Sequence, residues 1–431
     1  MRKMKDSGIE WIGEIPEDWE CFYLSQIFSQ VKNKNIGIQE TNLLSLSYGK
    51  IIRKNIETTF GLLPENFEGY NIIERDNIVL RLTDLQNDHK SLRVGLVTEK
   101  GIITSAYLTL KNKTNMASNY FYYLLHSFDI AKGFYGMGAG VRQGLNWNEI
   151  RSLRIISPKN VPEQQRIADF LDDKVSQIDS VISKTSETIE EYKKLKQSII
   201  TEVVTGKVKI ENGKVCGKYD TYKDSGVEWI GEIPSEWEVR ALKSLFHIFS
   251  GTTPKSDNPD FWDEDIKWVT PADFSTDDVF ISKGKRNISE RGFKSYALEM
   301  IPDGNLIFSK RAPIGKVCIN TDEMCINQGC LACVKKVDLD IKFFYYLLSV
   351  LTEYFELLGS GTTFKEISLS AFSNFKIPVP PLTSQLSLIT FLDKKCSEID
   401  KLITKKEQLV VELESYKKSL IYEVVTGKRS V

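Results

Sequence analysis

The chain has 431 residues, of which 41% are hydrophobic and 27% are charged, and its formal net charge at neutral pH is −1. This length predicts two or three domains, and the balance of residue types is that of an ordinary folded protein. No stretch of eighteen apolar residues occurs and no apolar signal core follows Met1–Asp6, so we expect a cytoplasmic protein without a membrane span. The near-zero charge neither supports nor excludes DNA binding, because acidic faces can balance a basic groove. Seven cysteines, an odd number, favour reduced thiols over a disulfide framework.

A long segment near the start of the chain is repeated in its second half. Residues 5–20 read KDSGIEWIGEIPEDWE, and residues 223–238 read KDSGVEWIGEIPSEWE. Shorter blocks recur in the same order, namely FYYLL at 121–125 and 344–348, FLD at 170–172 and 391–393, and EVVTGK at 202–207 and 423–428. Near-identity over such lengths indicates two tandem copies of one unit.

The two copies differ most in their centres, residues 25–115 and 243–335. Similar flanking segments around dissimilar central segments indicate two modules that perform the same function on two different targets. The alternative is that the copies have only drifted apart. Drift alone does not explain why the flanking segments stayed so similar while the central segments did not.

Each copy begins with a mixed, strand-rich module. Apolar runs bounded by turn residues predict strands, and aromatic-rich stretches predict short helices. We expect strands at Asn77–Arg81, Gly101–Thr104, Leu306–Ser309 and Cys330–Val334, and helices at Asn119–Leu125 and Ile341–Leu348. The Phe and Tyr side chains of these helices are interpreted as core residues rather than as platforms for stacked bases.

A long helix is predicted at the end of each copy, because apolar residues recur there at spacings of three and four. In the first copy they are Leu171, Val175, Ile178, Ile182, Ile189, Tyr192, Ile199 and Val203, with Thr185 and Lys196 filling the two gaps; in the second they are Leu392, Cys396, Ile399, Ile403, Val410, Leu413, Leu420 and Val424. A narrow apolar stripe flanked by charges is typical of a coiled-coil seam. Pro162 and Pro380-Pro381 precede the two patterns, and Gly206 and Gly427 follow them.

Roughly forty residues form a helical rod about 60 Å long. Two such rods of matching period bury their stripes best against each other, and antiparallel pairing would place the modules at opposite ends of a spacer. The alternative is that each helix packs on its own domain. The predicted fold class is therefore α+β, with two tandem strand-rich domains joined by two long antiparallel coiled-coil helices in a pseudo-twofold arrangement. The predicted boundaries are 1–161 (first module), 162–207 (helix), 208–222 (linker), 223–380 (second module) and 381–428 (helix).

The sequence contains no convincing catalytic motif, and GxxxxGK[ST] does not occur. Asn258-Pro259-Asp260-Phe261 loosely matches a loop of adenine methylases, but its third residue differs and no glycine-rich cofactor loop precedes it, so we interpret it as a turn. The cysteines at 318, 325, 330 and 333 do not predict zinc, because Cys330 and Cys333 lie in an apolar, strand-like run that the first copy lacks. Of the three histidines, His126 is interpreted as structural, while His89 could face DNA.

These features together resemble the specificity subunits of type I restriction–modification enzymes. The resemblance rests on the KDSG[IV]EWIGEIPxxWE opening, on the run Gly304–Lys316, on the Pro-x-Pro-Pro-Leu segment before the FLD helix, and on the order module, helix, module, helix. It covers nearly the whole chain. The first copy departs from the pattern at 157–162 and at 75–84, where the run reads RDNIVLRLTD.

The resemblance implies a non-catalytic subunit with two target-recognition domains, each of which reads one half of a bipartite DNA site. It further implies that two methylase subunits bind this chain, carry S-adenosylmethionine and methylate adenine N6. A motor-nuclease subunit that uses ATP and magnesium would join them, and the chain itself would hold no cofactor or metal. Two other readings remain: a stand-alone DNA nuclease or methylase, and a coiled-coil interaction scaffold without DNA binding.

Side chains that read DNA must combine hydrogen-bonding groups with positions on turns or strand ends. In the first module the candidates are Arg53, Lys54, Arg81, Thr83, Asp84, Arg93, Arg142 and Gln143. In the second they are Thr252, Thr253, Lys255, Lys310, Arg311, Lys316, Thr363 and Lys365. Arg81 and Asp84 could instead form an internal ion pair. Gly138, Gly140, Gly359 and Gly361 are interpreted as sharp turns or as loops that cradle phosphate.

Overall fold

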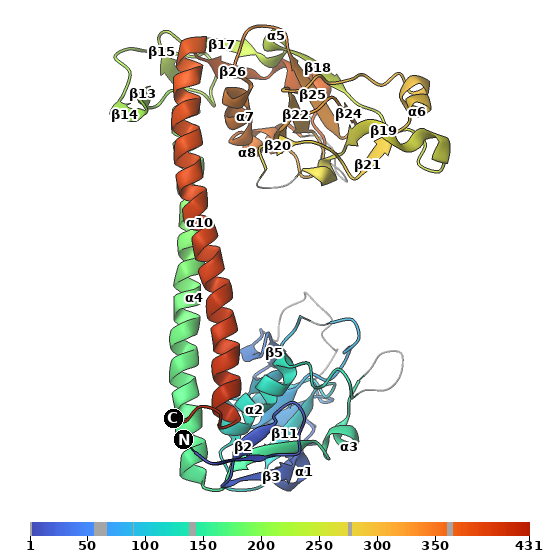
Figure 1. The fold of residues 1–431 in the computed structure, drawn as a ribbon, viewed down its shortest axis with the longest axis vertical. Coiled ribbons are helices and arrows are strands. Elements are labelled where there is room, and N and C mark those ends of the chain that lie inside the picture. The colour runs from blue at the N-terminus through green and yellow to red at the C-terminus, as the bar shows by residue number, and fades with distance from the viewer. Residues whose placement is uncertain (1, 56–66, 89, 138–143, 275–277, 360–364) are drawn as a thin grey trace. The chain divides into compact units, whose positions relative to one another are not determined.

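The computed structural model describes residues 2–55, 67–88, 90–137, 144–274, 278–359 and 365–431. These residues form two compact units, the first made of Met1–Ser186 and Glu407–Val431, the second of Glu187–Lys406 (Figure 1). Two 44-residue helices, α4 (Val161–Val204) and α10 (Leu382–Val425), contribute to both units. Within the described residues, no helix has both the length and the apolar character needed to cross a bilayer.

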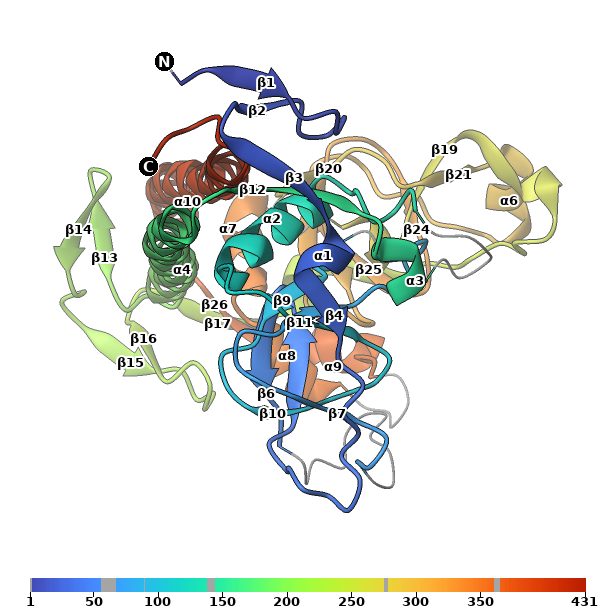
Figure 2. The same cartoon turned by 90° about the horizontal axis from the view of Figure 1, so that it is seen from below.

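The first unit is built mainly from the first module. Its elements besides the long helices are β1 (Met4–Asp6), β2 (Glu14–Pro16), β3 (Trp19–Tyr23), α1 (Leu24–Ile27), β4 (Phe28–Gln30), β5 (Leu44–Ser47), β6 (Lys50–Arg53), β7 (Asn71–Ile73), β8 (Ile78–Leu80), β9 (Val94–Leu96), β10 (Gly101–Ile103), β11 (Leu108–Asn112), α2 (Ser118–Ile130), α3 (Trp147–Ile150) and β12 (Arg154–Pro158). Strands β3 and β12 run side by side as an antiparallel pair (Figure 2).

A four-stranded antiparallel sheet in the order β4-β11-β8-β9 forms the centre of this unit. Successive residues of a strand point to opposite faces, and β8 shows the consequence. Ile78 and Leu80 pack into the core beneath α2, whereas Val79 packs with Leu44 and Ile73 on the other face. Both faces are covered, which explains why the strand is an unbroken apolar run.

The second unit repeats this plan with a different periphery. Its elements are β13 (Lys209–Glu211), β14 (Lys214–Gly217), β15 (Tyr222–Asp224), β16 (Glu232–Pro234), β17 (Glu238–Ala241), α5 (Leu242–Leu245), β18 (Phe246–Ser250), a 3-10 turn at Pro259–Phe261, β19 (Trp262–Val269), a second at Pro271–Asp273, β20 (Phe280–Ile281), β21 (Arg286–Ile288), α6 (Glu290–Ser295), β22 (Leu306–Ser309), β23 (Val317–Asn320), β24 (Cys325–Ile326), β25 (Cys330–Lys335), α7 (Ile341–Ser349), α8 (Thr352–Leu358), α9 (Leu369–Asn374) and β26 (Lys376–Val379).

The main sheet of the second unit has the order β18-β25-β22-β23-β20. Its first four strands match β4-β11-β8-β9 one for one, and β22 alternates as β8 does. Leu306 and Phe308 enter the core under α7, and Ile307 enters a separate cluster on the other face. The internal repeat of the sequence is therefore a repeat of one sheet topology.

The long helices pair in antiparallel fashion in each unit. In the first unit the N-terminal part of α4 lies beside the C-terminal part of α10, and Lys417 Nζ donates to Asp179 Oδ1 at 2.6 Å. In the second unit the opposite ends pair, and Lys196 Nζ donates to Asp400 Oδ1 at 2.7 Å. The apolar seam residues are buried or half-buried at the predicted positions, and Thr185 is 7% exposed. Forty-four residues give each helix a length of about 66 Å.

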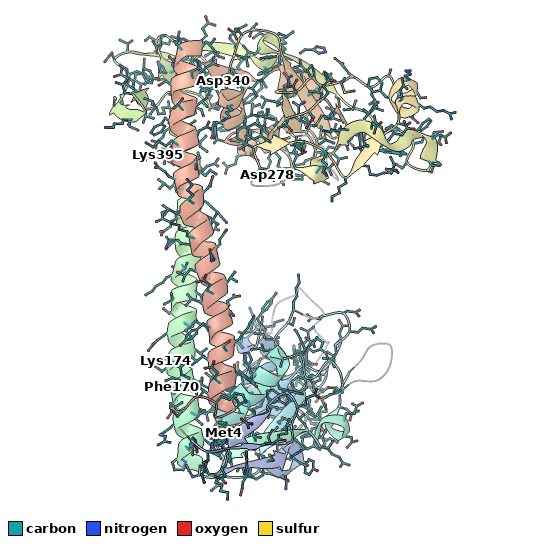
Figure 3. All side chains as sticks on the ribbon, in the orientation of Figure 1. Met4, Phe170, Lys174, Asp278, Asp340 and Lys395 are labelled. Carbon is teal, nitrogen blue, oxygen red and sulfur yellow. The ribbon has the colours of Figure 1, made fainter. Side chains whose placement is uncertain are left out.

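The helices also pack on the modules. Ile167, Ala168 and Leu171 at the start of α4 belong to the core of the first module, together with Leu420 and Val424 at the end of α10. Phe170 packs against the same core, and the Lys174 ammonium lies 6.0 Å from the centre of its ring (Figure 3). The alternative that each helix packs on its own module is therefore correct for the start of α4, but α10 ends on the first module.

The repeated sequence blocks contact each other, which explains why they stayed similar. In the first unit Lys428 Nζ donates to the carbonyls of Ile12 (2.6 Å) and Glu14 (3.0 Å). In the second unit Lys207 Nζ donates to the carbonyl of Glu232 at 3.0 Å. The EVVTGK blocks thus fasten the helix ends to the WIGEIP blocks.

A second contact between repeated blocks joins the FYYLL helices to the FLD segments of α4 and α10. Tyr123 Oη donates to Asp172 Oδ1 at 2.6 Å, and Tyr346 Oη donates to Asp393 Oδ1 at 2.8 Å. Both tyrosines are mostly buried, and burial together with these carboxylates raises the pKa of each phenol well above its usual value. The hydroxyls therefore stay protonated and keep donating.

The predicted fold class is confirmed. The strand predicted at Leu306–Ser309 is β22, and the other predicted strands are β8, β10 and β25 with shifts of one residue at their ends. The aromatic helix predicted at Asn119–Leu125 is longer and continues to Ile130 as α2. Its aromatic residues Tyr120 and Phe121 are fully buried, so they are core residues as predicted. The domain boundaries stay a prediction.

Candidate nucleic-acid interface

Two loops at matching places in the two sheets carry seven of the sixteen polar candidates. The first is the β8–β9 loop (residues 81–93), and the second is the β22–β23 loop (residues 310–316). Each joins the same pair of adjacent antiparallel strands in its sheet. Both follow a fully buried strand, so their backbones are anchored while their tips face outward.

The β8–β9 loop is attached to the core by two leucines and exposes polar residues beside them. Leu82 and Leu85 are at most 1% exposed and pack into the main core of the unit. Thr83 and Asn87 are exposed, and Asn87 Nδ2 donates to Asp84 Oδ1 at 2.8 Å. Asp84 adopts a positive φ of 57°, which turns the chain sharply at this point.

Arg93 does not have the position that the sequence predicted. It is fully buried, and its guanidinium points into the β8–β9 loop rather than toward solvent. Hydropathy alone predicts an exposed arginine side chain. Here five hydrogen-bond acceptors surround the guanidinium and compensate the free-energy cost of burying its charge. Arg93 is therefore removed from the candidates for direct DNA contact.

Arg81 forms an ion pair within this loop, but with a different carboxylate from the one in the alternative reading. Arg81 Nη2 lies 3.6 Å from Asp88 Oδ2, so its partner is Asp88 and not Asp84. Hydrogen bonds from Ser91 lower the pKa of Asp88 to about 2. Arg81 is still partly exposed, and only one edge of its guanidinium is occupied by this contact.

The other first-module candidates lie on β6 or outside the described residues. Arg53 and Lys54 are exposed at the end of β6, where Arg53 Nε donates to Glu99 Oε1 at 2.6 Å. Arg142 and Gln143 lie outside the described residues, as do His89, Gly138 and Gly140.

In the second module the β22–β23 loop is held by a carboxylate. Glu366 accepts from Lys310 Nζ at 2.9 Å and from Arg311 Nε at 2.8 Å. Lys310 is only 9% exposed, whereas Arg311 is exposed. Lys316 Nζ donates to the carbonyl of Phe274 at 3.3 Å. Arg311 is thus the most accessible cation of the three, and Lys310 has a mainly structural position.

The stretch after β18 contributes a second group of candidates in this module. Thr252 and Lys255 are exposed, and Thr253 donates its hydroxyl proton to the side chain of Gln328. Trp268 Nε1 donates to the carbonyl of Thr252 at 3.2 Å, which fixes the backbone there. Lys365 is exposed beside Glu366, while Thr363 and Gly361 lie outside the described residues.

Several groups that could have suggested catalysis have structural roles instead. The Asn258–Phe261 stretch forms a 3-10 turn capped by Asn258, as predicted. Cys330 and Cys333 are buried in β25, and burial raises the pKa of both thiols, which disfavours a metal-binding thiolate. His126 is buried in α2, and burial lowers its pKa to about 4. His247 lies 2.9 Å from Glu299.

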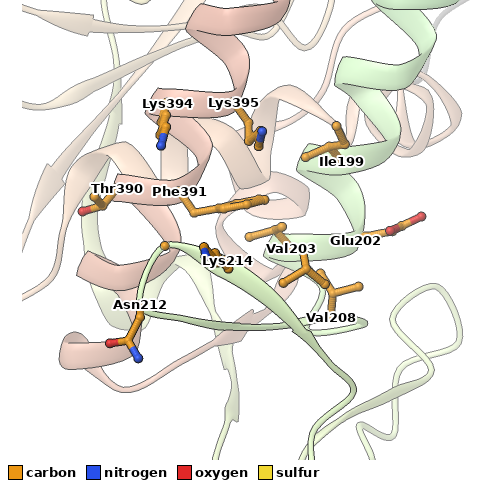
Figure 4. Close-up of a pocket in the computed structure, with 12 residues that line it drawn as sticks. Ile199, Glu202, Val203, Val208, Asn212, Lys214, Thr390, Phe391, Lys394 and Lys395 are labelled. Carbon is orange, nitrogen blue, oxygen red and sulfur yellow. The ribbon is translucent and has the colours of Figure 1, made fainter.

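A cavity of about 760 Å³ lies in the second unit between α4, α10 and the β13–β14 hairpin (Figure 4). Ile199, Val203, Val208 and Phe391 form its apolar wall, and Lys214, Lys394 and Lys395 lie around it. Glu202 is the only carboxylate among the residues that line it, and neither His nor Cys contributes.

Sequence reasoning missed the residues that support the β8–β9 loop, namely Asp129 and Tyr135. They lie 36 and 42 residues after Arg93, and no local pattern links them to it. Asn87 and Lys90 could have been found, because polar residues that follow a buried strand and alternate with buried leucines face outward.

Comparisons with known proteins place both copies in one family. Residues 16–191 and 234–412 match the family described as type I restriction modification DNA specificity domain. A putative type I restriction enzyme MjaX specificity subunit of Methanocaldococcus jannaschii is 28% identical, over 97% of this chain and 95% of that one. The MjaIX specificity subunit of the same organism is 34% identical, but over 42% of this chain and 41% of its own length.

Solved structures share the fold. A chain from a structure on the complex assembly and conformational transition of the type I R-M system has a TM-score of 0.74 and 17% identity, covering 96% of this chain and 99% of that one. The HsdS subunit of Thermoanaerobacter tengcongensis has a TM-score of 0.53 and 15% identity, covering 96% and 98%.

Proposed function

Because the chain belongs to the family of type I restriction modification DNA specificity domains and carries two copies, we propose that each copy reads one half of a bipartite DNA site. One observation carries the proposal. The same two adjacent strands present a polar loop in both modules, and the polar groups that are exposed rather than half-buried differ between the two loops. Thr83 and Asn87 occupy the first loop, and Arg311 occupies the second.

The chemistry of these groups suits reading of base edges. Asn and Thr can donate to and accept from bases in the major groove, while Arg pairs best with guanine. Lys90 is exposed in the first loop, Lys365 is exposed beside Glu366, which holds the second loop, and both would contact phosphates. Lys54 and Lys255 would add further phosphate contacts, which fix orientation without reading sequence. The two halves of the site should therefore have unlike sequences.

We further propose that the chain is non-catalytic and that methylase subunits perform the chemistry. In this proposal two methylases bind S-adenosylmethionine and methylate adenine N6, one in each half-site, and a motor-nuclease with ATP and magnesium joins them for restriction. The predicted division into modules 1–161 and 223–380 with spacer helices 162–207 and 381–428 belongs to this proposal. The near-zero net charge of the chain is compatible with it, since the basic loops occupy only part of each module.

Identical exposed residues in both copies support two equivalent partner surfaces. Glu10 and Glu14 are exposed in the first opening block, and their counterparts Glu228 and Glu232 are exposed in the second. Packing of the core does not require identical exposed residues in the two copies. Binding of the same partner to both copies does require them. We expect the charge reversal E10K to reduce the bound methylases from two to one in native mass spectrometry, with E17K as the exposed control. Loss of both methylases, or of neither, would contradict this assignment.

The experiment that tests the proposed function is selection of DNA by the reconstituted complex. The chain with its methylases should select, from a random library, a bipartite motif with an unspecified spacer, and its affinity should fall steeply with salt. The chain alone with S-adenosylmethionine or magnesium should neither methylate nor cleave. Selection of no motif would favour a scaffold, and catalysis by the purified chain would favour an enzyme.

A further inference from the structure

Arg93 makes an unusual set of hydrogen bonds for a buried charged side chain. Its Nη1 donates to the carbonyls of Arg81 (3.0 Å) and Thr83 (2.8 Å), and its Nη2 donates to those of Asp84 (3.3 Å) and Asp88. Its Nε donates to Tyr135 Oη at 2.9 Å. A guanidinium has five N–H donors, so every donor of Arg93 is used.

The four backbone acceptors all belong to one segment, Arg81–Asp88, which forms most of the β8–β9 loop. The distance between the first and last acceptor along the chain is seven peptide units, yet one planar group contacts both. The β8–β9 ladder continues only to the base of the loop, where the Arg81 N–H donates to the Arg93 carbonyl at 2.9 Å; beyond that point the Arg93 guanidinium donates to four of the loop carbonyls. Arg93 therefore determines the path of the loop backbone.

Two side chains hold Arg93 itself in place. Asp129 Oδ2 on α2 accepts from the Arg93 backbone N–H at 2.7 Å. Tyr135 also donates its own hydroxyl proton to the carbonyl of Asp88 at 3.1 Å, and the Arg93 guanidinium lies 5.1 Å from the Tyr135 ring centre. The loop is thus connected to α2 and to the segment after it through Arg93 and Tyr135.

We infer that Arg93 is a positioning residue for DNA reading by the first module: it fixes the β8–β9 loop so that Thr83, Asn87 and Lys90 present a preformed surface to the first half-site. This inference rests on the proposed function. Because the described residues of this thirteen-residue loop are already ordered in the free protein, DNA binding does not have to supply the entropy cost of ordering them. Such preorganisation favours binding that discriminates between sequences. In the second module, Glu366 fixes the β22–β23 loop through Lys310 and Arg311.

The test compares three variants of the full chain in the reconstituted methylase complex. R93K keeps the positive charge but can make only three of the five hydrogen bonds. Y135F removes the hydroxyl and leaves the ring, so its effect should be smaller. K113A changes an exposed cation that directly follows β11 in the same unit, and it serves as the matched control.

The readout is discrimination, measured as the ratio of methylation rates on the cognate site and on sites mismatched in one half. We expect R93K to lower discrimination in the first half about tenfold or more, the order of one lost base contact, and to leave the second half unchanged. Amide hydrogen exchange of residues 82–92 should become faster in R93K, while residues 306–320 stay protected.

The outcomes separate the inference from the proposed function. If the wild-type complex discriminates in neither half, the proposed function fails. If the wild type discriminates and R93K keeps first-half discrimination, the positioning role is wrong. Equal loss in both halves, or faster exchange throughout the first unit, would show that Arg93 acts on general stability and would also overturn the inference.

Discussion

The length of the paired helices should set the distance between the two DNA half-sites. The perturbation that tests this is an insertion of four helix-forming residues after Glu187 in α4 and of four more after Lys406 in α10. These are the places where each helix passes from one compact unit to the other. The insertion leaves the contacts inside both units unchanged.

The expected size of the effect follows from helix geometry. Four residues add about 6 Å to each rod at 1.5 Å per residue, and they exceed one full turn by only about 40°. DNA rises about 3.4 Å per base pair, so the unspecified spacer should lengthen by one or two base pairs. The two half-site sequences should not change, because the β8–β9 and β22–β23 loops are far from the insertions in sequence.

The assay is a sequencing map of methylated adenines in cells that carry the inserted chain with its methylases. A control variant, with the exposed residues Glu187, Glu190 and Glu191 changed to alanine, keeps the helix length and should keep the wild-type spacer. The reasoning is refuted if the inserted chain recognises altered half-sites. It is refuted as well if methylation continues at the original spacing.

Three further predictions follow from individual parts of the chain. Exchange of residues 243–335 for the centre of another specificity subunit should alter only the second half-site in the same methylation map, and a change in both halves would contradict independent modules. The variant G427A should lower the thermal unfolding midpoint of the chain, because Gly427 has a φ of +72° and an added Cβ would lie 2.4 Å from Pro16 Cδ. The expected cost is about 2 kcal/mol or more. The control G13A has a similar φ of +70° but open space around the Cβ, so it should cost less, and equal shifts would show that the contact is unimportant. Burial raises the pKa of Asp129 to about 6 from an ordinary 3.8, so the folded state binds a proton more tightly than the unfolded state. The stability that Asp129 contributes is therefore complete below about pH 4 and is lost as the pH rises through about 6. Relative to D129N, the wild type should lose about 3 kcal/mol between pH 4 and pH 7 in denaturant titrations, and a constant difference across this range would be inconsistent with a raised pKa.

The repeated and periodic parts of the chain were predictable from sequence. The apolar run Leu306–Ser309 matches β22 residue for residue, and the apolar seam residues of the long helices are buried or half-buried at the predicted positions. Periodicity is local information, and it reports which face of an element is covered. The duplicated blocks likewise indicated two equivalent units before any fold was known.

The supports of the candidate site were not predictable, because they depend on contacts between distant residues. Arg93 looks like a DNA contact by its charge, yet its environment consists of backbone carbonyls, which no sequence pattern reports. Gly427 likewise packs closely against Pro16, which lies 411 positions earlier in the sequence. Sequence indicated that the repeated blocks matter, and the contacts between them supply the reason.

The central claim is that two unlike readers on one chain select the two halves of a DNA site. A genome-wide map of methylated adenines, made in cells with the methylase genes and either with or without this chain, tests it most directly. We predict that one bipartite motif with dissimilar halves is methylated only when the chain is present. A continuous motif, two identical halves, or methylation that does not depend on the chain would contradict the account.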